Sequence, residues 1–421
     1  MRVAFYFDNS RLGKWGWPDF IAGRVAMSGT DSQILHLLSR INRQSDVEAC
    51  GYFQDASPEM APEKFQGVGS VEDAVSLAKS ASAEILVLNS NNNKETLQRA
   101  VYACESANLP IVVWDQNGPY PEVRDLLASA RVVRRVVCVS NSQADCVRHH
   151  QVFNKIAVIY NSLLSWNEEH LGNESNPSDR SNRVCFLGAT IPQKGFHLVA
   201  RAWPGIKSSV TDATLTIIGS SRLYDRRQEV GPLGLCSREF EETQIHPFFG
   251  HSLEEARERG VDVKALMSPI EIRRSLRQQQ VVIVNPCVER GGSFETFSVS
   301  AIEAQAEGCA VVGGRRVGLR ETVLGGVTGT LIDSEDQLAP AVVRLLMESD
   351  VASRMGQRGR KWVEEQFPAD NADSQWITLL RGVLVGAPVR PIPFSVRRAR
   401  LKDYARAIVR FYRQIRPLSN E

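Results

Sequence analysis

The feature that most restricts the fold of this chain is a repeated alternation of short apolar runs with helical patterns. The runs are rich in Val and Ile and carry few charges, which is typical of strands buried on both faces of a parallel sheet. Between them, as in residues 95–108, apolar residues recur at three and four positions, the period of an amphipathic helix. Strands that alternate with helices in this way predict α/β domains with doubly wound parallel sheets. The expected strands are 2–7, 47–53, 84–88, 110–114, 135–140 and 156–160 in the first half, and 183–188, 213–219, 281–286, 309–314 and 328–333 in the second.

One polar segment, residues 166–182, interrupts the alternation, and its Gly172 and Pro177 indicate a linker. At 421 residues the chain exceeds the size at which a single hydrophobic core stops growing, so two domains are expected from length alone. We therefore predict Rossmann-like domains at 1–165 and 183–385. Sheets of this kind bind ligands beyond the carboxyl ends of their strands, so a cleft between the two domains is the expected site.

Residues 222–262 do not follow the alternation. They are polar and rich in turn-forming residues, and we interpret them as an insertion without an assigned role.

The C-terminal segment 386–421 differs from the rest of the chain in charge. From Ala387 onward it contains nine basic and two acidic residues, a net charge of +7, so the remainder carries −5 of the overall +2. Apolar residues recur at helical spacing between 401 and 415, with arginines at 406, 410 and 413 between them. A basic amphipathic helix of this kind could lie on an anionic membrane through residues 396–416, or pack back onto the protein with its basic face in water. The sequence leaves both readings open.

Composition narrows the class of protein further. The eight cysteines occur singly, without a Cys-x-x-Cys pair, which is the pattern of reduced, packed thiols in a cytosolic protein. The first residues, MRVAFYFD, are too short for a secretory signal, and no apolar run approaches the roughly 20 residues of a membrane span. The seven histidines show no metal-ligand spacing. We expect a cytoplasmic protein, peripheral at most to the inner face of a membrane, with no metal and no nucleic-acid partner.

The stretch ETFSVSAIEAQAEG, which starts at Glu295, places two carboxylates eight positions apart. It follows an expected strand and a Gly-rich loop, so it predicts a helix that begins near Thr296. On such a helix Glu295 and Glu303 would lie about 12 Å apart along the axis, too far to share one reacting atom. That spacing suits the two ends of an extended ligand.

The groups between the two carboxylates suggest which ligand. The amides of Thr296, Phe297 and Ser298 would point out of the helix start, where a phosphate is stabilised by free N–H groups and the helix dipole. A nucleotide-sugar presents a hydroxyl-rich group, a diphosphate and a second hydroxyl-rich group in this order. Alternatively, Glu295 caps the helix and Glu303 lies on a solvated face; the spacing alone leaves both open.

Four segments resemble a known family. NPCVERGGSFETFSVSAIEAQAEGCAVVGGRRVGLRETVLGGVTGTLID closely resembles the donor-site signature of the GT4-like (glycosyltransferase group 1) family of GT-B glycosyltransferases, a glutamate-x7-glutamate pattern followed by a small-residue helix and a Gly-rich return. FLGATIPQKGFHLVARAW is similar to the start of that family's donor domain, CVSNSQADCVRHHQVFNKIAVIYNSL to the end of its acceptor domain, and MSGTDSQILHLLSRI to its N-terminal loop and helix. The matches run from about residue 2 to 380. They imply two Rossmann-like domains that face a central cleft, with the acceptor bound by the first and the donor by the second.

The resemblance also implies roles for residues on the donor side. Glu295 would lie beside the hydroxyls of the transferred sugar, Glu303 would hold the ribose, and Lys194 would contact the diphosphate, so Glu295 and Lys194 are the expected catalytic residues. The family normally has an arginine at the position of Ala189, and either Arg315 or Arg316 replaces it or donor affinity is weak. The implied donor-binding residues are Gly188, Lys194, Glu295, Thr296, Phe297, Ser298 and Glu303.

On the acceptor side the chain departs from the family. Many relatives carry histidines after the fourth and fifth strands, where this chain has Asn89 with Asn91 and Gln116 with Asn117. Side-chain amides can orient a hydroxyl but do not titrate near neutrality. For Asp31 an N-cap role is an equally good expectation. The implied acceptor-binding residues are Gly29, Thr30, Asp31, Gln116 and Asn117.

The expected function is transfer of a sugar from a UDP- or GDP-sugar to a hydroxyl of a saccharide or lipid-linked acceptor, with retention, in glycan, polysaccharide or glycolipid synthesis. The nucleotide-sugar is a substrate, and no cofactor or metal is expected. A P-loop is excluded because Gln193 and Gly195 stand where that motif requires Gly and Ser or Thr. The alternative is a catalytically silent GT-B relative that acts as a binding subunit, a reading motivated by Ala189 and the missing histidines.

Overall fold

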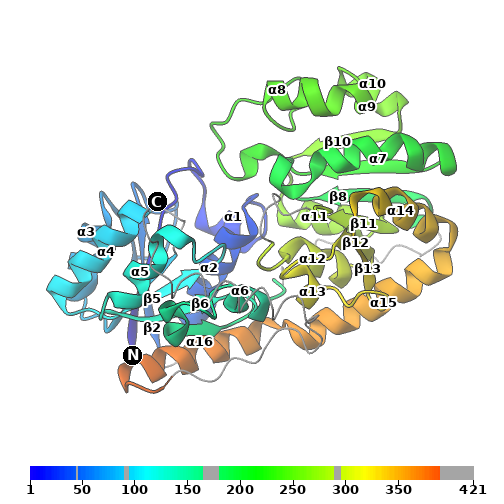
Figure 1. Cartoon of the computed structure of the whole chain (residues 1–421). Helices are drawn as coiled ribbons and strands as arrows, with labels where there is room; N and C mark the ends of the chain where they lie inside the picture. Colours follow the sequence, from blue (N-terminus) through cyan, green and yellow to red (C-terminus); the bar gives the residue numbers. More distant parts are fainter. Residues whose placement is uncertain (44–45, 90–93, 165–179, 289–294, 389–421) are drawn as a thin grey trace, which may run out of the picture.

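Two α/β domains lie side by side in the computed structural model of the chain (Figure 1). The structure describes residues 1–43, 46–89, 94–164, 180–288 and 295–388. The predicted linker falls largely outside these ranges, and so does nearly all of the basic C-terminal segment.

The first domain contains a seven-stranded parallel sheet in the order β3-β2-β1-β4-β5-β6-β7. Alternate residues of its central strand enter different cores: Val3, Phe5 and Phe7 pack on one face, and Ala4 and Tyr6 on the other. Burial of both faces explains why the strand is an unbroken apolar run. The strands are β1 (Arg2–Phe7), β2 (Glu48–Gln54), β3 (Phe65–Val68), β4 (Ile85–Asn89), β5 (Ile111–Asp115), β6 (Val133–Cys138) and β7 (Ile156–Val158), and the helices α1 (Trp17–Ile21), α2 (Gly29–Ile41), α3 (Val71–Ser80), α4 (Lys94–Ala107), α5 (Pro121–Ser129) and α6 (Asn141–Asp145).

The second domain has a six-stranded parallel sheet in the order β10-β9-β8-β11-β12-β13. Each sheet reverses its strand order beside its first strand, β1 or β8, and helices cover both faces, so the prediction of two doubly wound domains is confirmed. The strands are β8 (Arg183–Leu187), β9 (Thr214–Ile218), β10 (Val261–Ala265), β11 (Val281–Val284), β12 (Ala310–Gly314) and β13 (Gly329–Ile332), and the helices α7 (Phe196–Ser209), α8 (Arg238–Phe240), α9 (His246–Phe249), α10 (Leu253–Glu258), α11 (Pro269–Leu276), α12 (Val299–Ala306), α13 (Leu319–Thr322), α14 (Leu338–Met347), α15 (Ser349–Gln366) and α16 (Ala369–Leu384).

The segment 222–262 is an ordered part of the second domain. It contains α8 to α10 and reaches the edge strand β10. Inside it the fully buried carboxylate of Glu241 accepts backbone N–H groups from Leu233 at 2.9 Å, Leu235 at 2.8 Å and Cys236 at 3.1 Å. A buried carboxylate needs such donors. Glu241 therefore fixes the conformation of the loop at 233–236, which belongs to no strand or helix.

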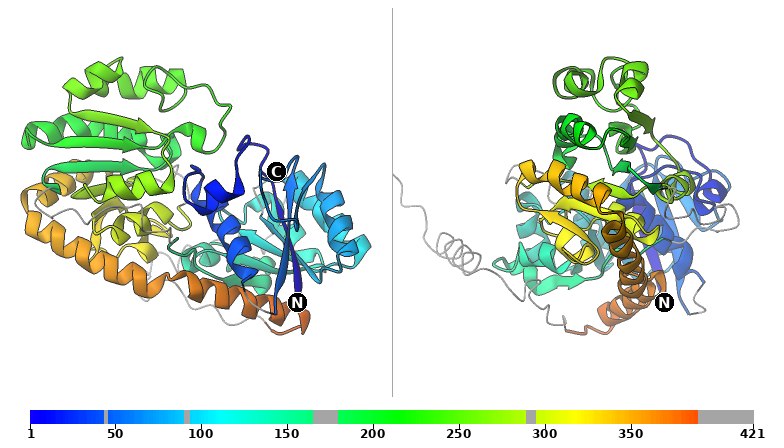
Figure 2. Two further views of the ribbon diagram at one scale, coloured as in Figure 1. Left: turned by 180° about the vertical axis from the view of Figure 1, so that it is seen from behind. Right: turned by 90° about the vertical axis from the view of Figure 1, so that its right-hand side faces the viewer.

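The helix α16 crosses back to the first domain, along the base of the molecule (Figures 1 and 2). Its Trp376 ring packs on Trp114 of β5 with centroids 4.5 Å apart, and its Asp373 accepts two hydrogen bonds from Arg40 of α2, at 2.8 and 2.9 Å. The predicted unit 183–385 therefore includes a helix whose core contacts belong to the first domain.

A second link between the domains is made by Glu321 of α13. Its carboxylate accepts the amides of Asn141 at 3.0 Å and Ser142 at 2.6 Å, both in the first turn of α6, and the hydroxyl of Tyr160 at 2.7 Å. An acidic group at a helix amino end is stabilised by the free N–H groups there. The two domains are thus joined by directed polar contacts as well as by packing.

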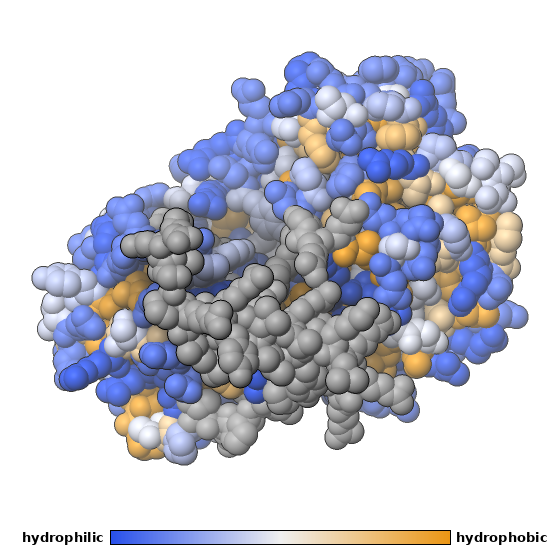
Figure 3. Space-filling view, viewed as in Figure 1, coloured by the Kyte–Doolittle hydropathy of each residue, from blue (hydrophilic) through white to orange (hydrophobic). Residues whose placement is uncertain are grey.

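None of the helices in the described ranges is both long enough and apolar enough to cross a bilayer. On the face seen in Figure 3 the described surface is mostly hydrophilic, with apolar residues in separate patches. The eight cysteines are free thiols, and all except Cys146 are buried.

The Arg40–Asp373 ion pair should contribute measurably to the free energy of unfolding, because it docks α16 on the first domain. The two side chains are only 15% and 8% exposed, so Asp373→Ala leaves a buried guanidinium unpaired and should lower the free energy of unfolding by roughly 3 kcal/mol. Asp370→Ala, on the exposed first turn of the same helix, is the matched control and should cost less than about 1 kcal/mol. Urea denaturation measures both. Equal costs would mean that docking of α16 does not depend on this ion pair.

Candidate active site

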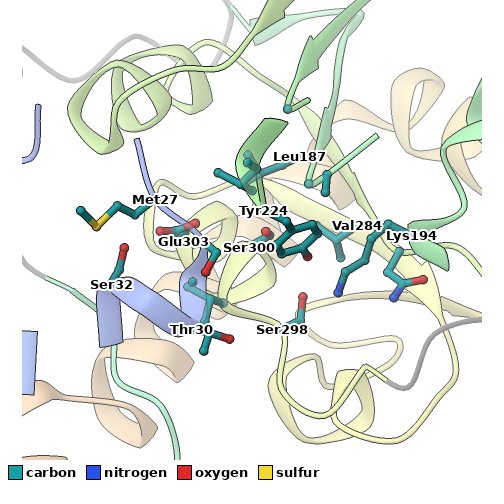
Figure 4. A pocket seen from close by; sticks show the side chains of 18 of the residues that line it. Met27, Thr30, Ser32, Leu187, Lys194, Tyr224, Val284, Ser298, Ser300 and Glu303 are labelled. Atoms are coloured by element: carbon teal, nitrogen blue, oxygen red, sulfur yellow. The ribbon is translucent and has the colours of Figure 1, made fainter. Parts of the chain in front are cut away.

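A cavity of about 390 Å³ lies between the two domains, at the carboxyl ends of their strands (Figure 4). The first domain contributes the residues that lead into α2 and the loop after β5. The second domain contributes the loops after β8, β9, β10 and β11 and the start of α12. A ligand here would contact both domains, as the strand pattern predicts.

The carboxylate of Glu295 is fixed by two donors. Its Oε2 atom accepts from Lys194 Nζ at 2.8 Å and from Asn285 Nδ2 at 2.8 Å, and its side chain is only 9% exposed. Burial is the largest single influence and disfavours the charge on Lys194, but Glu295, together with Tyr224 and Cys287, more than offsets it and raises the pKa of the lysine. The ammonium is therefore permanently charged at the wall of the cavity.

The turn that carries Lys194 is restricted by a close approach of backbone. Lys194 ends a short 3₁₀ turn, and the next residue, Gly195, has φ of 70°. A Cβ atom at this position would lie 2.9 Å from Cys287 Sγ and 3.1 Å from the ring of Pro286. Only glycine fits, because both the φ angle and the space exclude a side chain. The lysine is thereby aimed at Glu295 from the neighbouring strand end.

The helix predicted from Thr296 begins three residues later, at Val299, so that prediction is wrong. Ser298 is its N-cap, and its hydroxyl accepts the amide of Ala301 at 3.3 Å. Thr296 instead bonds through Oγ1 to the backbone oxygen of Gln116, and Phe297 packs on the first domain. Contacts between the domains therefore hold these residues in a non-helical conformation, and the 12 Å helical separation does not apply to Glu295.

The amino end of α12 still faces the cavity. The first-turn amides of Val299 and Ser300 have no acceptor within the helix, and both residues line the cavity. The amino end of α2 approaches the same point, because a Cβ atom on Gly29 would lie 3.1 Å from Val299 Cβ. Two helix dipoles thus make this part of the cavity favourable for an anion.

All seven predicted donor-side residues line the cavity. Glu303 lies on α12 and lines the cavity. Burial raises the pKa of its carboxyl group to about 7; the charge of Arg273 lowers this pKa, and the charge of Glu307 raises it further. Glu307 itself is held by Arg273 at 2.5 Å and Arg277 at 2.8 Å. Glu303 is therefore a carboxylate whose charge changes near neutrality. The seven residues are Gly188, Lys194, Glu295, Thr296, Phe297, Ser298 and Glu303.

On the acceptor side, Gly29, Thr30, Gln116 and Asn117 line the cavity, but Asp31 does not. Ser28 is the N-cap of α2, so Asp31 is not; the Asp31 carboxylate accepts the hydroxyl of Ser28 at 2.7 Å, and the Asp31 amide donates to the same oxygen at 3.2 Å. Burial raises the pKa of Asp31 to about 6, although its hydrogen bond with Ser28 opposes the shift.

The missing arginine is not replaced by either predicted candidate. Ala189 is buried at the cavity wall, and neither Arg315 nor Arg316 lines it. Arg315 is paired with Asp333 at 3.0 Å. Among the described residues that line the cavity, Lys194 is the one cation. Asn89 does not line the cavity and Asn91 lies outside the described ranges.

Sequence reasoning missed several polar residues of the cavity, four of which come from loops that follow strands. Asn161 follows β7, Asn285 follows β11, and the aromatic residues Tyr120 and Tyr224 come from the loops after β5 and β9. Tyr120, Asn161 and Tyr224 lie beyond predicted strands, whereas Asn285 falls inside the predicted strand 281–286, so the sequence offered little signal for these four residues. In the described part of the chain, no group of three or more His, Cys, Asp or Glu residues could hold a metal ion.

Comparison with known proteins agrees with this architecture. The family model described as Glycosyl transferases group 1 matches residues 167–362. A "GDP-mannose-dependent alpha-(1-6)-phosphatidylinositol monomannoside mannosyltransferase" of Mycolicibacterium smegmatis is 30% identical over 209 residues, 48% of this chain and 48% of that protein. The chain thus spans about half the length of the curated relatives that it matches first.

Two solved structures share the fold over about nine-tenths of the chain. Anabaena Alr3699/HepE in complex with UDP and glucose has a TM-score of 0.64 at 14% identity and covers 91% of this chain and 100% of its own. Sucrose-phosphate synthase from Thermosynechococcus elongatus has a TM-score of 0.64 at 12% identity, with 92% of this chain and 100% of its own covered. Similarity at this level of identity is a similarity of fold.

The raised pKa of Glu303 predicts a pH-dependent stability. The folded-state pKa of about 7 exceeds the ordinary 4.5, so this residue favours folding fully below pH 4.5, and the contribution is lost as pH rises through about 7. Glu303→Gln removes the titration, so at pH 8 it should be more stable than the wild type, by on the order of 3 kcal/mol, and equal to it at pH 4. Thermal unfolding from pH 4 to 8 tests this, with Glu364→Gln on the exposed face of α15 as control. A pH-independent difference for Glu303→Gln would contradict it.

Proposed function

Residues 167–362 belong to the glycosyl transferases group 1 family, and the chain has the GT-B fold; on this premise we propose that the protein transfers a sugar from a nucleotide-sugar to a hydroxyl acceptor. The supporting observation is the Lys194–Glu295 pair, 2.8 Å long, which lies in the interdomain cavity together with the start of α12. It combines a fixed cation, a fixed carboxylate and free amides in one cavity shared by two domains.

In the proposed reaction the bond between the sugar and the diphosphate breaks, and negative charge develops on the leaving phosphate. Lys194 has three N–H donors and uses one on Glu295, so the others are available to the phosphate. The amides of Val299 and Ser300 add a second, fixed source of positive potential. Because both act most strongly where charge develops, they lower the barrier.

Glu295 would bind the sugar itself. Lys194 and Asn285 both donate to Oε2 of Glu295, so Oε1 can accept a sugar hydroxyl. Glu303 would accept the ribose hydroxyls at the other end of the donor. Part of the cavity lining is apolar, formed by Leu266, Met267 and Ile272, and suits the flat face of a base.

We further propose transfer with retention, without a metal or cofactor. The positive charge that a metal would bring to the diphosphate is supplied by Lys194 and the helix start. The acceptor-side amides of Gln116 and Asn117 do not titrate near neutrality, so the leaving phosphate would take the acceptor proton as the hydroxyl attacks on the same face of the sugar. GDP-mannose and UDP-glucose are the first donors to test, because the mycobacterial relative is GDP-mannose-dependent and Anabaena Alr3699/HepE has been solved in complex with UDP-glucose.

The charge on Lys194 should matter mainly in the transition state. Lys194→Met should lower the rate of nucleoside diphosphate release from the correct donor roughly 100- to 1000-fold. Lys361→Met, an exposed lysine of α15, is the control and should leave it unchanged. A coupled assay with several nucleotide-sugars measures the release, and EDTA should not alter it. A rate for Lys194→Met within a few-fold of the wild type would contradict this role.

The second candidate function is a catalytically silent binding subunit, favoured by the buried Ala189 in place of an arginine. The release assay and a thermal-shift screen together separate the two. A protein that binds none of the nucleotide-sugars in a thermal-shift screen would be the silent form, whereas slow release that Glu295→Ala abolishes would identify an enzyme.

The acceptor, a saccharide or a lipid-linked glycan made for polysaccharide or glycolipid synthesis, would enter from the first domain. We propose peripheral membrane contact through residues 396–416, which lie outside the described ranges, on the basis of the tail's net charge of +7. The full chain should co-sediment with vesicles that contain phosphatidylglycerol, and a chain that ends at Gly386 should not; both should ignore pure phosphatidylcholine. Equal sedimentation of the two chains with these vesicles would contradict a membrane contact through residues 396–416.

A further inference from the structure

Two segments, one from each domain, meet at the edge of the interdomain cavity. Residues 8–28 connect β1 to α2 in the first domain, and residues 219–228 follow β9 in the second; Figures 1 and 2 show the dark blue first segment beside the green second domain. Arg226 joins the two: its amide donates to the backbone oxygen of Arg11 at 3.3 Å, and its guanidinium donates to the backbone oxygen of Ala26. The contact therefore forms only when the domains are docked as they are in this structure.

This contact adjoins the cavity on both sides. Met27, the residue after Ala26, lines the cavity, and so do Leu223 and Tyr224, which precede Arg226. Arg226 does not line the cavity itself. A ligand that reaches its side chain must therefore extend beyond the cavity.

The guanidinium of Arg226 has no counter-ion among the described residues. It is partly buried, and burial lowers its pKa without an opposing contribution from any carboxylate. Of its five N–H donors, one bonds to Ala26. A partly buried charge with unused donors is unfavourable until an anion pairs with it, so this position suits an anion.

Two further arginines increase the positive charge at this edge. Arg11 and Arg222 are exposed, and neither forms an ion pair with a described residue. We call Arg11, Arg222 and Arg226 the arginine edge. Residues 8–14 and 219–228 together contain five basic and two acidic residues, a net charge of +3.

The two acids of these segments do not pair with the arginine edge. Asp225 accepts two hydrogen bonds from Arg227, each at 3.0 Å, and its pKa is lowered to about 2, chiefly by Arg227 and to a smaller extent by Arg11. Asp8 accepts the hydroxyl of Ser10 at 2.7 Å. An anion could therefore bind at the arginine edge without displacing an existing ion pair.

The position of the arginine edge favours the acceptor over the donor as its ligand. The donor would lie inside the cavity, between Glu295 and Glu303, whereas the acceptor would enter from the first domain. Guanidinium groups pair with phosphate oxygens through parallel N–H bonds. We propose that the arginine edge binds a phosphate group of the acceptor, which makes the acceptor a phosphorylated sugar or a glycan on a phospholipid headgroup. This inference rests on the proposed function and adds the chemical class of its acceptor.

Calorimetric titration of the full chain tests the inference with glucose 6-phosphate and glucose as probes. The protein is first saturated with UDP or GDP, whichever binds, so that the diphosphate site at Lys194 is filled and further phosphate binding occurs at the arginine edge. Glucose 6-phosphate should bind roughly 10-fold more tightly than glucose, and added salt should reduce the difference.

Arg11→Met and Arg226→Met should each remove most of this difference and leave the nucleotide affinity unchanged. The exposed side chain of Arg11 forms no ion pair with a described residue, so its replacement should not disturb the fold. Arg358→Met, which alters an exposed arginine of α15, is the matched control and should keep the difference.

Vesicles of phosphatidylcholine with phosphatidylinositol distinguish the two sources of the phosphate. Arg226→Met in the full chain should co-sediment with them less than the wild type if the phosphate belongs to a lipid headgroup, and equally if it belongs to a soluble sugar.

Three results of the titration would overturn the inference. Glucose 6-phosphate could bind no more tightly than glucose, it could bind only when no nucleotide is present, which would assign it to Lys194, or Arg11→Met and Arg226→Met could both keep the difference. A wild type that binds neither UDP nor GDP would instead overturn the proposed function.

Discussion

The cavity depends on one buried carboxylate. The side chain of Glu295 joins the turn after β8, through Lys194, to the end of β11, through Asn285. Its backbone oxygen accepts the amide of Gly318 at 2.7 Å, which ties in the loop after β12. Three neighbouring strand ends are thereby held at one point. A buried carboxylate without these donors would carry a large desolvation cost. The burial of Glu295 and its hydrogen bonds with Lys194 and Asn285 therefore depend on each other.

The residues that follow Glu295 transfer this order to the first domain. Thr296 bonds to the backbone of Gln116, and the ring of Phe297 packs against those of Tyr160 and Phe367, with centroids 5.9 and 5.3 Å away. The buried carboxylate of Glu295 and the contacts between the domains therefore occupy consecutive positions of one segment. A small change in how the domains dock would therefore move Glu295 directly, because only one or two peptide bonds separate it from Thr296 and Phe297.

The two domains can be predicted from the sequence, because strands buried on both faces leave a clear apolar signal. The spacing of Glu295 and Glu303 indicates an extended ligand, whereas the role of Lys194 is implied only by the family resemblance. The start of α12 could not be predicted, since the intrinsic pattern of TFSVSAIEA is helical from Thr296 and only contacts with the other domain extend the chain there. Asp31 was misjudged because Ser28, a better N-cap, stands three residues earlier. Asn161 and Asn285 are short polar residues in loops, and nothing local distinguishes a residue that faces a cavity from one that faces water.

The return of α16 to the first domain has a consequence for how the protein is made. Trp114 and Arg40 are synthesised early, but the groups that cover and neutralise them, Trp376 and Asp373, emerge from the ribosome after the entire second domain. The first domain therefore cannot complete its core during its own synthesis. The Trp114 ring and the Arg40 guanidinium stay uncovered until almost the whole chain has been translated.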